Sequence, residues 1–370
     1  MALKPEGLCG QLTDPRRLLA VWALVAGLSA CGGGSHDRSA AETPGRDAAV
    51  SDAGSDTADA SPDLPQDTSG DAAADAAPDD AADATDAGRD VPLDTNPADA
   101  DVSEDTPDTA LPRACNGHPA LCERRLDEIT LATTHNAMSN EAEGWLGPNQ
   151  QFGITRQLED GVRGMMLDTH RWNGDLYLCH TVCNFGNKLL VDGLREIAAF
   201  LETHPDEVMA IIFQDGISAE ETAGAFEDSG LIEYVYTHDP QAPWPTLGAM
   251  IDSNQRLLAT AESSGPPPAW YHHAWDIVFD TPYNFDRSEA FSCELNRGQA
   301  SNDLFLINHW ITVILPSPDG AAEVNQYEPL LARARACEEE QQHHPNFLAV
   351  DFYATGDLFA VVDELNGVAD

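Results

Sequence analysis

Short apolar runs of strand character alternate with segments of helical spacing, from about residue 129 to residue 365. Such alternation is typical of a parallel sheet whose strands are joined by helices, and about 250 residues is the usual size of a (β/α)8 barrel. We therefore predict an α/β fold whose strand count approaches that of a (β/α)8 barrel. The predicted strands are residues 129–134, 161–168, 175–180, 207–215, 256–261, 303–308 and 347–353, and the predicted helices are residues 189–203, 219–228, 246–253, 325–342 and 358–365.

Polar residues that can do chemistry stand at or just after the ends of these strands. In a barrel of parallel strands the carboxyl ends converge on one mouth, where active sites lie. A single polar residue at a strand end is usually just a group whose hydrogen bonds are satisfied. The recurrence of such residues at strand after strand, however, predicts a functional site. The residues are His135, Asn136, Asp168, His180, Gln214, Asp215, Asn308, His309 and Asp351.

The start of the chain has the features of an export signal. Two arginines precede an apolar run over residues 18–30. This run is shorter than the about 20 residues that span a bilayer, so it predicts a secretory signal peptide over residues 1–30. Leu28-Ser29-Ala30-Cys31, followed by glycines, resembles the lipobox of bacterial lipoproteins, in which the cysteine carries lipid. We expect an exported protein anchored to the bacterial cell envelope through Cys31; the alternative is an ordinary cleaved signal with an incidental cysteine.

The segment that follows has a composition unsuited to folding. Residues 35–110 contain 21 acidic and three basic residues, and no Phe, Trp or Tyr occurs between residues 35 and 113. Such a segment cannot bury enough apolar surface to offset its ordering entropy. We predict a disordered acidic linker over residues 31–113. A calcium-binding repeat is the alternative, but no Asp-x-Asp-x-Asp-Gly spacing occurs.

Residues 114–370 are then the folded domain, for which we expect a monomer. The formal net charge of the whole chain is −44. This charge argues against a nucleic-acid partner, because binding phosphate backbones requires clustered Lys and Arg. It also argues against a polybasic contact with anionic lipid headgroups.

The cysteines of this domain agree with export. Six remain once Cys9 leaves with the signal and Cys31 is set aside, and an even number in an exported protein favours disulfides. Many pairings are possible. Closeness in sequence suggests Cys115–Cys122 and Cys179–Cys183, which leaves Cys293–Cys337. A zinc site is the alternative, but no Cys-x-x-Cys pair exists.

Several motifs of the domain match a known pattern in order and spacing. They are residues 133–138 (TTHNAM), 157–168 (QLEDGVRGMMLD), 178–180 (LCH) and 345–353 (PNFLAVDFY). Together they resemble the X domain of phosphatidylinositol-specific phospholipase C, closest to the secreted phosphodiesterase-like branch of plants and fungi. The resemblance covers about residues 126–367 and implies an irregular TIM barrel. It also implies a phosphoric diester hydrolase of phospholipase C type, acting on a phosphoinositide-like or related phosphodiester.

The resemblance assigns proton-transfer roles to two histidines, a residue type suited to such work near neutral pH. His135 would be the base that takes the proton of the inositol 2-hydroxyl, and His180 the acid that protonates the diacylglycerol oxygen. Asp351 matches the carboxylate that holds the first histidine. Arg163 matches a shared arginine, which we interpret first as a structural ion-pair residue and second as a phosphate ligand.

The resemblance also implies a metal. Metal-free bacterial members carry Asp after the first His and Arg at the position of Asp168, whereas Asn136 and Asp168 match the calcium-dependent members. Without that arginine no fixed cation is left, and a divalent cation, Ca²⁺, is the simplest source of positive charge. Gln214 and Asp215 would complete the ligands. Met166 and Gln214 replace two acids of the calcium-dependent pattern, so we expect weak affinity.

Other functions and other roles stay open at this point. The domain could be a catalytically degenerate surface binding module, or a phosphodiesterase acting on glycerophosphodiesters or sphingolipids. Only one lysine lies in the domain, which favours a singly phosphorylated headgroup. Trp172, Trp310 and Tyr353 follow strand ends and are either stacking platforms for a sugar-like ring or packing at the rim.

Overall fold

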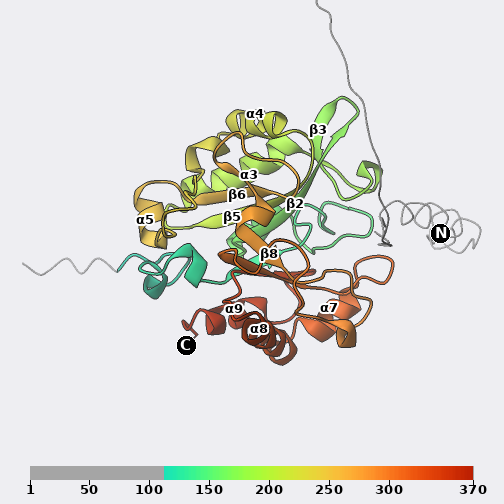
Figure 1. The fold of residues 1–370 in the computed structure, drawn as a ribbon. Helices are drawn as coiled ribbons and strands as arrows, with labels where there is room; N and C mark the ends of the chain where they lie inside the picture. The colour runs from blue at the N-terminus through green and yellow to red at the C-terminus, as the bar shows by residue number, and fades with distance from the viewer. Residues whose placement is uncertain (1–111, 370) are drawn as a thin grey trace, which may run out of the picture. The chain divides into compact units, whose positions relative to one another are not determined.

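The computed structural model describes residues 112–369, so the predicted signal peptide, Cys31 and nearly all of the predicted linker lie outside it. A curled parallel sheet forms the centre of these residues, with helices along its outer side (Figure 1). Its strand order is β7-β6-β5-β2-β1-β10-β9-β8. The strands are β1 (Leu131–Thr134), β2 (Gly164–Trp172), β5 (Met209–Gly216), β6 (Leu257–Ala261), β7 (Tyr271–His273), β8 (Val278–Asp280), β9 (Leu304–His309) and β10 (Phe347–Val350).

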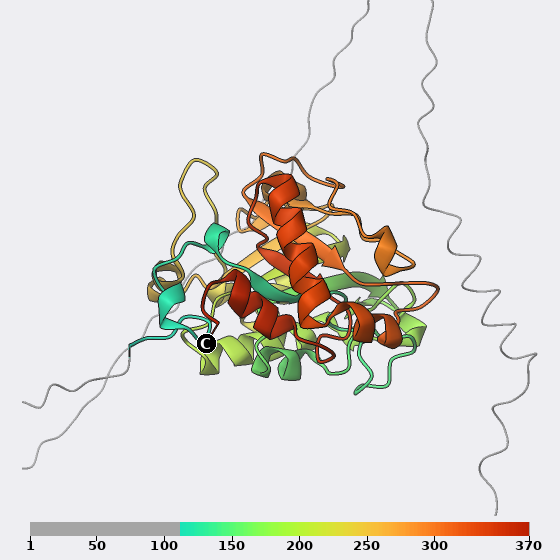
Figure 2. The ribbon, with the colours of Figure 1, turned by 90° about the horizontal axis from the view of Figure 1, so that it is seen from below.

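Helices connect most of these parallel strands, which confirms the predicted α/β class. Figure 2 shows the sheet from below, with α8 and α9 lying across it. Both helices bury their apolar residues against the outer face of the strands. The helices are α2 (Ile154–Glu159), α3 (Leu190–Thr203), α4 (Ala219–Ser229), α5 (Leu247–Asp252), α6 (Ala274–Ile277), α7 (Pro318–Val324), α8 (Tyr327–Gln341) and α9 (Leu358–Leu365).

The barrel is irregular in two ways that the sequence did not indicate. Its two edge strands, β7 and β8, are not paired with each other, so the sheet is curled but open. Both are three residues long and lie in a stretch for which no strand was predicted. The predicted strand at residues 175–180 is β3 (Asp175–Leu178), which pairs antiparallel with β2 and with β4 (Lys188–Leu189). It belongs to a hairpin on the β2-to-α3 connection and is not a wall of the barrel.

Successive residues of each strand alternate between two cores. In β5, Ala210 and Ile212 join the cluster that fills the inside of the curled sheet, whereas Ile211 and Phe213 pack against the helices outside. The period of two follows from strand geometry, in which neighbouring side chains point to opposite faces. Continued to the carboxyl ends, the same alternation decides which polar residues face the mouth.

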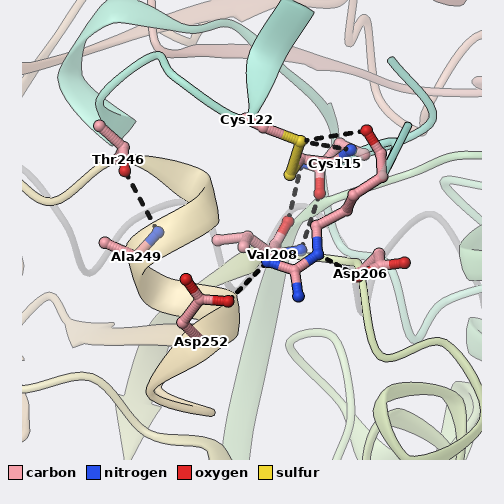
Figure 3. Close-up of a disulfide and its surroundings, with 9 residues drawn as sticks. Cys115, Cys122, Asp206, Val208, Thr246, Ala249 and Asp252 are labelled. Atoms are coloured by element: carbon pink, nitrogen blue, oxygen red, sulfur yellow. Dashed lines mark hydrogen bonds and ion pairs between the residues drawn. A yellow bond between two sulfur atoms is a disulfide. The ribbon is translucent and has the colours of Figure 1, made fainter. Parts of the chain in front are cut away.

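The amino end of the barrel is closed by an apolar plug. Leu121, Leu126 and the Cys115–Cys122 disulfide lie in the inner cluster, together with Trp244 of the segment before α5. Figure 3 shows the disulfide beside the start of β5 and α5. The side-chain amide of Asn116 donates to Val208 O at 3.0 Å, and the Val208 N–H donates back to Asn116 Oδ1 at 2.7 Å.

The two disulfides suggested by closeness in sequence, Cys115–Cys122 and Cys179–Cys183, are present, and so is the remaining pair, Cys293–Cys337. Within residues 112–369, no helix combines the length and the apolar character needed to cross a membrane.

Candidate active site

His135 lies directly after β1 and is held from three sides. Its Nδ1 is 2.8 Å from Asp351 Oδ1, and Asp351, directly after β10, is 2% exposed. The Asn149 amide donates to the same carboxylate oxygen at 3.0 Å. Trp310 stacks on the imidazole with a centroid distance of 3.8 Å and an interplanar angle of 6°. The Nδ1 proton is therefore fixed toward Asp351, which leaves Nε2 for chemistry.

Asn136 connects His135 to Asp168. Its backbone adopts a left-handed conformation (φ 48°), which asparagine tolerates better than most residues. One terminal atom of its amide lies 3.1 and 3.2 Å from the two Asp168 oxygens, and the other lies 3.1 Å from His135 Nε2. With its nitrogen toward Asp168, the amide donates to a charged carboxylate and accepts from a protonated Nε2. With its oxygen toward Asp168, a proton or a cation must lie between the two groups.

Asp168 is a carboxyl group in an unfavourable setting for charge. It is 4% exposed, and burial raises its pKa well above the usual value, with the nearby Glu262 carboxylate adding to the effect. Both causes act in the same direction, because burial and like charge each disfavour the ionised form. The group therefore binds a proton, or another positive charge, more readily than an exposed aspartate.

His180 reaches the mouth on a loop closed by the Cys179–Cys183 disulfide. Burial lowers its pKa to about 4, and the neighbouring His135 and His170 contribute in the same direction. The contribution of His135 means that its imidazole lies in the neighbourhood of His180. Since the charged form is disfavoured, His180 is neutral at pH 7 before any anion binds.

Of the remaining candidate metal ligands, the structure brings only one beside Asp168. Gln214 on β5 is the register partner of Asp168 on β2 and is exposed. Asp215 is the next residue and lies on the other face of the strand, where its Oδ1 accepts from the Ser263 N–H at 2.8 Å. Among residues 112–369, no three His, Cys, Asp or Glu side chains are arranged to hold a metal ion. The candidate cation ligands thus reduce to Asp168, Asn136 and Gln214.

Arg163 lies away from this group. It directly precedes β2, at the amino end of the barrel, and its Nε binds Glu207 at 2.7 Å. It also donates to the Leu158 and Val162 carbonyls, and its guanidinium lies 4.7 Å from the Phe200 ring centroid. The structure therefore gives Arg163 the ion-pair role and places it too far along β2 to reach a phosphate at the mouth.

A cation that the sequence did not indicate lies at the carboxyl end instead. Arg297 donates to Asp280 Oδ2 from Nη2 at 2.6 Å and from Nε at 3.0 Å, and its Nη1 donates to Glu262 Oε1 at 3.0 Å. Asp280 ends β8 and Glu262 follows β6, so the guanidinium joins the two sides of the open edge. It lies 4.0 Å from the Trp275 ring centroid. No periodic sequence pattern indicates Arg297. It lies in a loop, and its role follows only from its ion pairs with residues at the ends of two strands that are distant in sequence.

The other strand-end candidates divide between the two faces. Asn308 is buried and donates to Asp280 Oδ2 at 3.0 Å, so it supports the Arg297 network. His309 is turned outward, with Nε2 2.9 Å from Val324 O, and takes no part in the site. Trp310 and Tyr353 are buried packing groups, since Trp310 covers His135 and the Tyr353 hydroxyl donates to Asp160 at 2.8 Å.

Comparison with protein families gives one match of broad extent. A family model described as PI-PLC X 1 matches residues 121–366. A PI-PLC X domain-containing protein 1 of Arthroderma benhamiae is 27% identical over 289 residues, which cover 70% of this chain and 93% of that protein. A PI-PLC X domain-containing protein of Arabidopsis thaliana is 31% identical over 270 residues, 65% of this chain and 62% of that protein.

A further relative and two solved structures complete the comparison. An uncharacterized secreted protein of Arthroderma benhamiae is 28% identical over 69% of this chain, which spans 64% of that relative. The phosphatidylinositol-specific phospholipase C of Listeria monocytogenes superposes with a TM-score of 0.47 and 17% identity, covering 67% of this chain and 96% of that one. The corresponding enzyme of Staphylococcus aureus gives a TM-score of 0.47 and 12% identity, covering 67% and 95%.

Proposed function

The chain belongs to the PI-PLC X domain family, and from this premise we propose that it is a phosphodiesterase of phospholipase C type that uses His135 and His180 for proton transfer. The observation that carries the proposal is the fixed imidazole of His135. Its Nδ1 is bound to the buried Asp351 at 2.8 Å, and Trp310 prevents the ring from turning. A histidine restrained in this way presents one nitrogen in one direction, which is what a general base requires.

The two proton-transfer groups of the site are those needed to cleave a phosphodiester through a neighbouring hydroxyl. His135 Nε2 takes the proton of a hydroxyl next to the phosphodiester, and the resulting oxygen forms a bond to phosphorus. The bond from phosphorus to the leaving alcohol breaks, and His180 delivers a proton to that oxygen. The products are a cyclic phosphate and a free alcohol, with no atom unaccounted for.

His180 must be protonated to act as the acid, although its pKa is about 4 in the unliganded site. A bound phosphodiester supplies a negative charge beside it, and an opposite charge favours the protonated form. We infer that substrate binding raises the pKa of His180 and so prepares the acid. An uncharged ligand would leave His180 neutral, so the phosphodiester group itself would be part of what the site recognises.

A divalent cation stays part of the proposal, with Ca²⁺ as the first candidate. One terminal atom of the Asn136 amide lies within 3.2 Å of the Asp168 carboxylate, and Gln214 lies beside Asp168 in register. With its oxygen turned toward Asp168, Asn136 would join that carboxylate as a hard ligand. When bound, the ion would offset negative charge on the phosphoryl oxygens. A single carboxylate among these residues predicts weak affinity. Asp215 is left out of the ligand set, because its carboxylate binds the Ser263 N–H on the other face of β5.

The substrate and the place of action are proposed on the same basis. The names of the relatives and the restrained histidine support a phosphoinositide-like diester, with a singly phosphorylated headgroup. The only lysine of the domain, Lys188, binds Glu143 at 2.6 Å and also binds Glu196, which leaves it poorly placed to bind additional phosphates. Three disulfides and a relative described as secreted support export, and the lipobox-like sequence supports an anchor at Cys31.

The test is an assay of the purified chain against phosphatidylinositol and a panel of glycerophosphodiesters, with EDTA and across a calcium titration. We expect a cyclic phosphate from phosphatidylinositol, and an activity that rises with added calcium. If the protein cleaves glycerophosphodiesters but not phosphatidylinositol, the proposed substrate class is wrong. Full activity in EDTA would remove the metal from the proposal. Binding of the headgroup with no turnover of any diester would identify a binding module instead of an enzyme.

A further inference from the structure

The backbone turns away from the sheet directly after each member of the His135–Asp351 pair. The register between β1 and β10 ends one residue before His135 on one side and one residue before Asp351 on the other. The residues that follow them, Asn136 and Phe352, have positive φ angles of 48° and 50°. A left-handed backbone is uncommon for a bulky residue such as phenylalanine. The regular pairing of the two strands therefore stops just before the two side chains that must stay together.

Gln150, in the loop between β1 and α2, continues this pairing with its side chain. Its Nε2 donates to the backbone oxygens of His135 at 2.7 Å and of Val350 at 3.0 Å. Its Oε1 accepts from the Tyr353 N–H at 3.1 Å. A side-chain amide has the same kinds of donor and acceptor as a peptide unit. Because Gln150 is fully buried, its amide takes the place of a strand residue between the ends of β1 and β10.

Asn149, the preceding residue, holds the Asp351 side chain and the backbone that follows it. Its Nδ2 donates to Asp351 Oδ1 at 3.0 Å and lies 3.4 Å from His135 Nδ1. Its backbone oxygen accepts from the Phe352 N–H at 2.7 Å. One buried residue thus contacts both members of the pair and also fixes the left-handed turn behind Asp351.

The hydrogen bonds of the Asp351 carboxylate all fall on one oxygen. Oδ1 accepts from His135 and from Asn149, whereas Oδ2 is buried with no hydrogen-bond partner among residues 112–369. With His135 as its only side-chain partner, the carboxylate could turn Oδ2 toward the imidazole or swing away from it. The second donor, from Asn149, selects the orientation in which Oδ1 faces Nδ1.

We propose that Asn149 and Gln150 are positioning residues of the site. Gln150 holds the ends of β1 and β10 together, and Asn149 directs the Asp351 carboxylate at His135 Nδ1. Both act through the His135–Asp351 pair and have no contact with the reacting atoms. This inference deepens the proposed function and rests on it, because it states how the general base is prepared. Precise placement matters, since a displacement of about 1 Å can lower a rate by about 10²-fold.

The kinetic test is Asn149→Leu, which keeps the size of the side chain and removes the amide donor. The matched control is Gln151→Leu. Gln151 donates to Thr355 Oγ1 at 2.7 Å, beyond the same turn, and in the described part of the chain it has no hydrogen bond to His135 or Asp351. For the test variant we expect kcat to fall by roughly 10–100-fold with KM changed little. The control should keep the kcat of the parent.

The pH–rate profile gives a readout that a merely structural role would not move. In Asn149→Leu the acidic limb should move to lower pH, because a carboxylate that turns away stabilises the protonated imidazole of His135 less. In Gln151→Leu the limb should stay where it is in the parent. A shift to higher pH in Asn149→Leu would mean that the amide offsets the charge of Asp351 instead of directing it, and the inference would be wrong.

The positioning can also be measured without turnover, by proton NMR of the full chain with isotope-labelled histidine. The Nδ1–H of His135 should give a far-downfield resonance, identified by its absence in His135→Ala. We expect this proton to exchange with water faster in Asn149→Leu than in the parent, and at the parent rate in Gln151→Leu. Asn149→Ser, with a smaller side chain that does not reach Asp351, should show the same faster exchange and serves if leucine is not accommodated.

Two further results would overturn the inference. One is parent-like exchange in the folded Asn149 variants, and the other is an equal acceleration in Gln151→Leu, which would indicate a general loosening of the turn. The proposed function fails separately. If the parent cleaves no diester, but its Nδ1 proton is protected and loses this protection only in the Asn149 variants, the proposed function is wrong and the positioning role of Asn149 stands.

Discussion

The amino and carboxyl ends of the barrel differ in the kinds of groups that they bury. At the amino end, an apolar plug, the Cys115–Cys122 disulfide and the Arg163–Glu207 ion pair close the barrel, and His238 Nε2, whose ring stacks on Trp244, is buried without a hydrogen-bond partner among residues 112–369. At the carboxyl end, Asp351 Oδ2 and Asn308 Oδ1 are buried without a hydrogen-bond partner within residues 112–369. Burying a polar atom without a hydrogen-bond partner lowers the stability of the fold, whereas burying the apolar side chains of the plug raises it.

The difference teaches where to look for function in such a barrel. At the mouth, burial shifts the pKa of Asp168 upward and that of His180 downward, both against the charged form. Burying ionisable groups in this way lowers the stability of the fold, so the rest of the domain must be stable enough to offset the loss. We therefore expect substitutions at the mouth to affect turnover and substitutions at the amino end to affect folding.

The largest expected effect is at the mouth. His135→Ala and His180→Ala should each lower kcat by about 10²–10⁴-fold, because each removes a group that transfers a proton in the transition state. The thermal midpoint of His180→Ala should stay near that of the parent, whereas that of His135→Ala should fall, because the buried Asp351 carboxylate then loses its ring partner. The measurement is steady-state kinetics together with a thermal melt. Near-full activity in His180→Ala would show that another group is the acid.

A smaller loss is expected when the base is kept and only its partner changes. Asp351→Asn preserves the shape but offers Nδ1 of His135 an amide in place of a carboxylate, so the ring is less well fixed. We expect kcat to fall by roughly 10²-fold, with KM changed little, because the ring is less well fixed, and the loss should approach about 10⁴-fold if the wrong tautomer becomes dominant. A pH–rate profile distinguishes this role from a structural one, since the loss should be accompanied by a shifted acidic limb, which reports protonation of the base. An unchanged profile with normal kcat would remove Asp351 from the site.

At the amino end, Arg163→Ala should act on stability alone. It leaves the Glu207 carboxylate buried without its partner, and breaking such a pair costs about 3–5 kcal/mol when it is fully buried. Both side chains are slightly exposed, so we expect about 2–3 kcal/mol from urea unfolding. The double variant Arg163→Met with Glu207→Leu should recover part of this loss. A fall in kcat of the folded Arg163→Ala protein would revive the role of phosphate ligand.

The plug predicts a similar loss without any change in turnover. Cys115→Ser with Cys122→Ser opens a loop of seven residues, and closure of so short a loop is worth about 2–3 kcal/mol on the chain-entropy account. The matched comparison is Cys179→Ser with Cys183→Ser, whose loop carries His180. The double variant Cys179→Ser with Cys183→Ser should lose activity as well as stability. Equal kinetics in the two double variants would mean that the Cys179–Cys183 disulfide does not position His180.

The smallest effect concerns pH. The pKa of His180 is about 4 in the folded protein and about 6.5 in the unfolded chain, so the unfolded state binds the proton first as the pH falls. Stability from this group is complete above pH 6.5 and is lost as the pH falls toward 4, by about 1–2 kcal/mol at pH 5. His180→Asn should therefore show a smaller difference in unfolding free energy between pH 7 and pH 5. A parent-like difference would mean that other buried histidines, such as His309, dominate.

The sequence by itself determined the architecture and most of the chemical groups of the mouth. Alternating apolar runs and helices specify a parallel sheet, because each strand buries both faces and most connections between parallel strands contain a helix. His135, Asp168 and Asp351 come together because the carboxyl ends of parallel strands meet at one edge. Closeness in sequence also suggested the disulfides Cys115–Cys122 and Cys179–Cys183, whereas Cys293–Cys337, with a sequence separation of 44, followed only as the remaining pair.

Only the tertiary structure decided which of these groups face one another. A strand places neighbours on opposite faces, so the register decided that Gln214 lies beside Asp168 while Asp215 and His309 turn outward. The stacking of Trp310 on His135 joins loops about 175 residues apart, and no local pattern records such a contact. Arg297 is the clearest case. It binds Glu262, directly after β6, and Asp280, at the end of β8, and these two strands are not paired with each other. Local propensity carries no information about a contact between such distant segments.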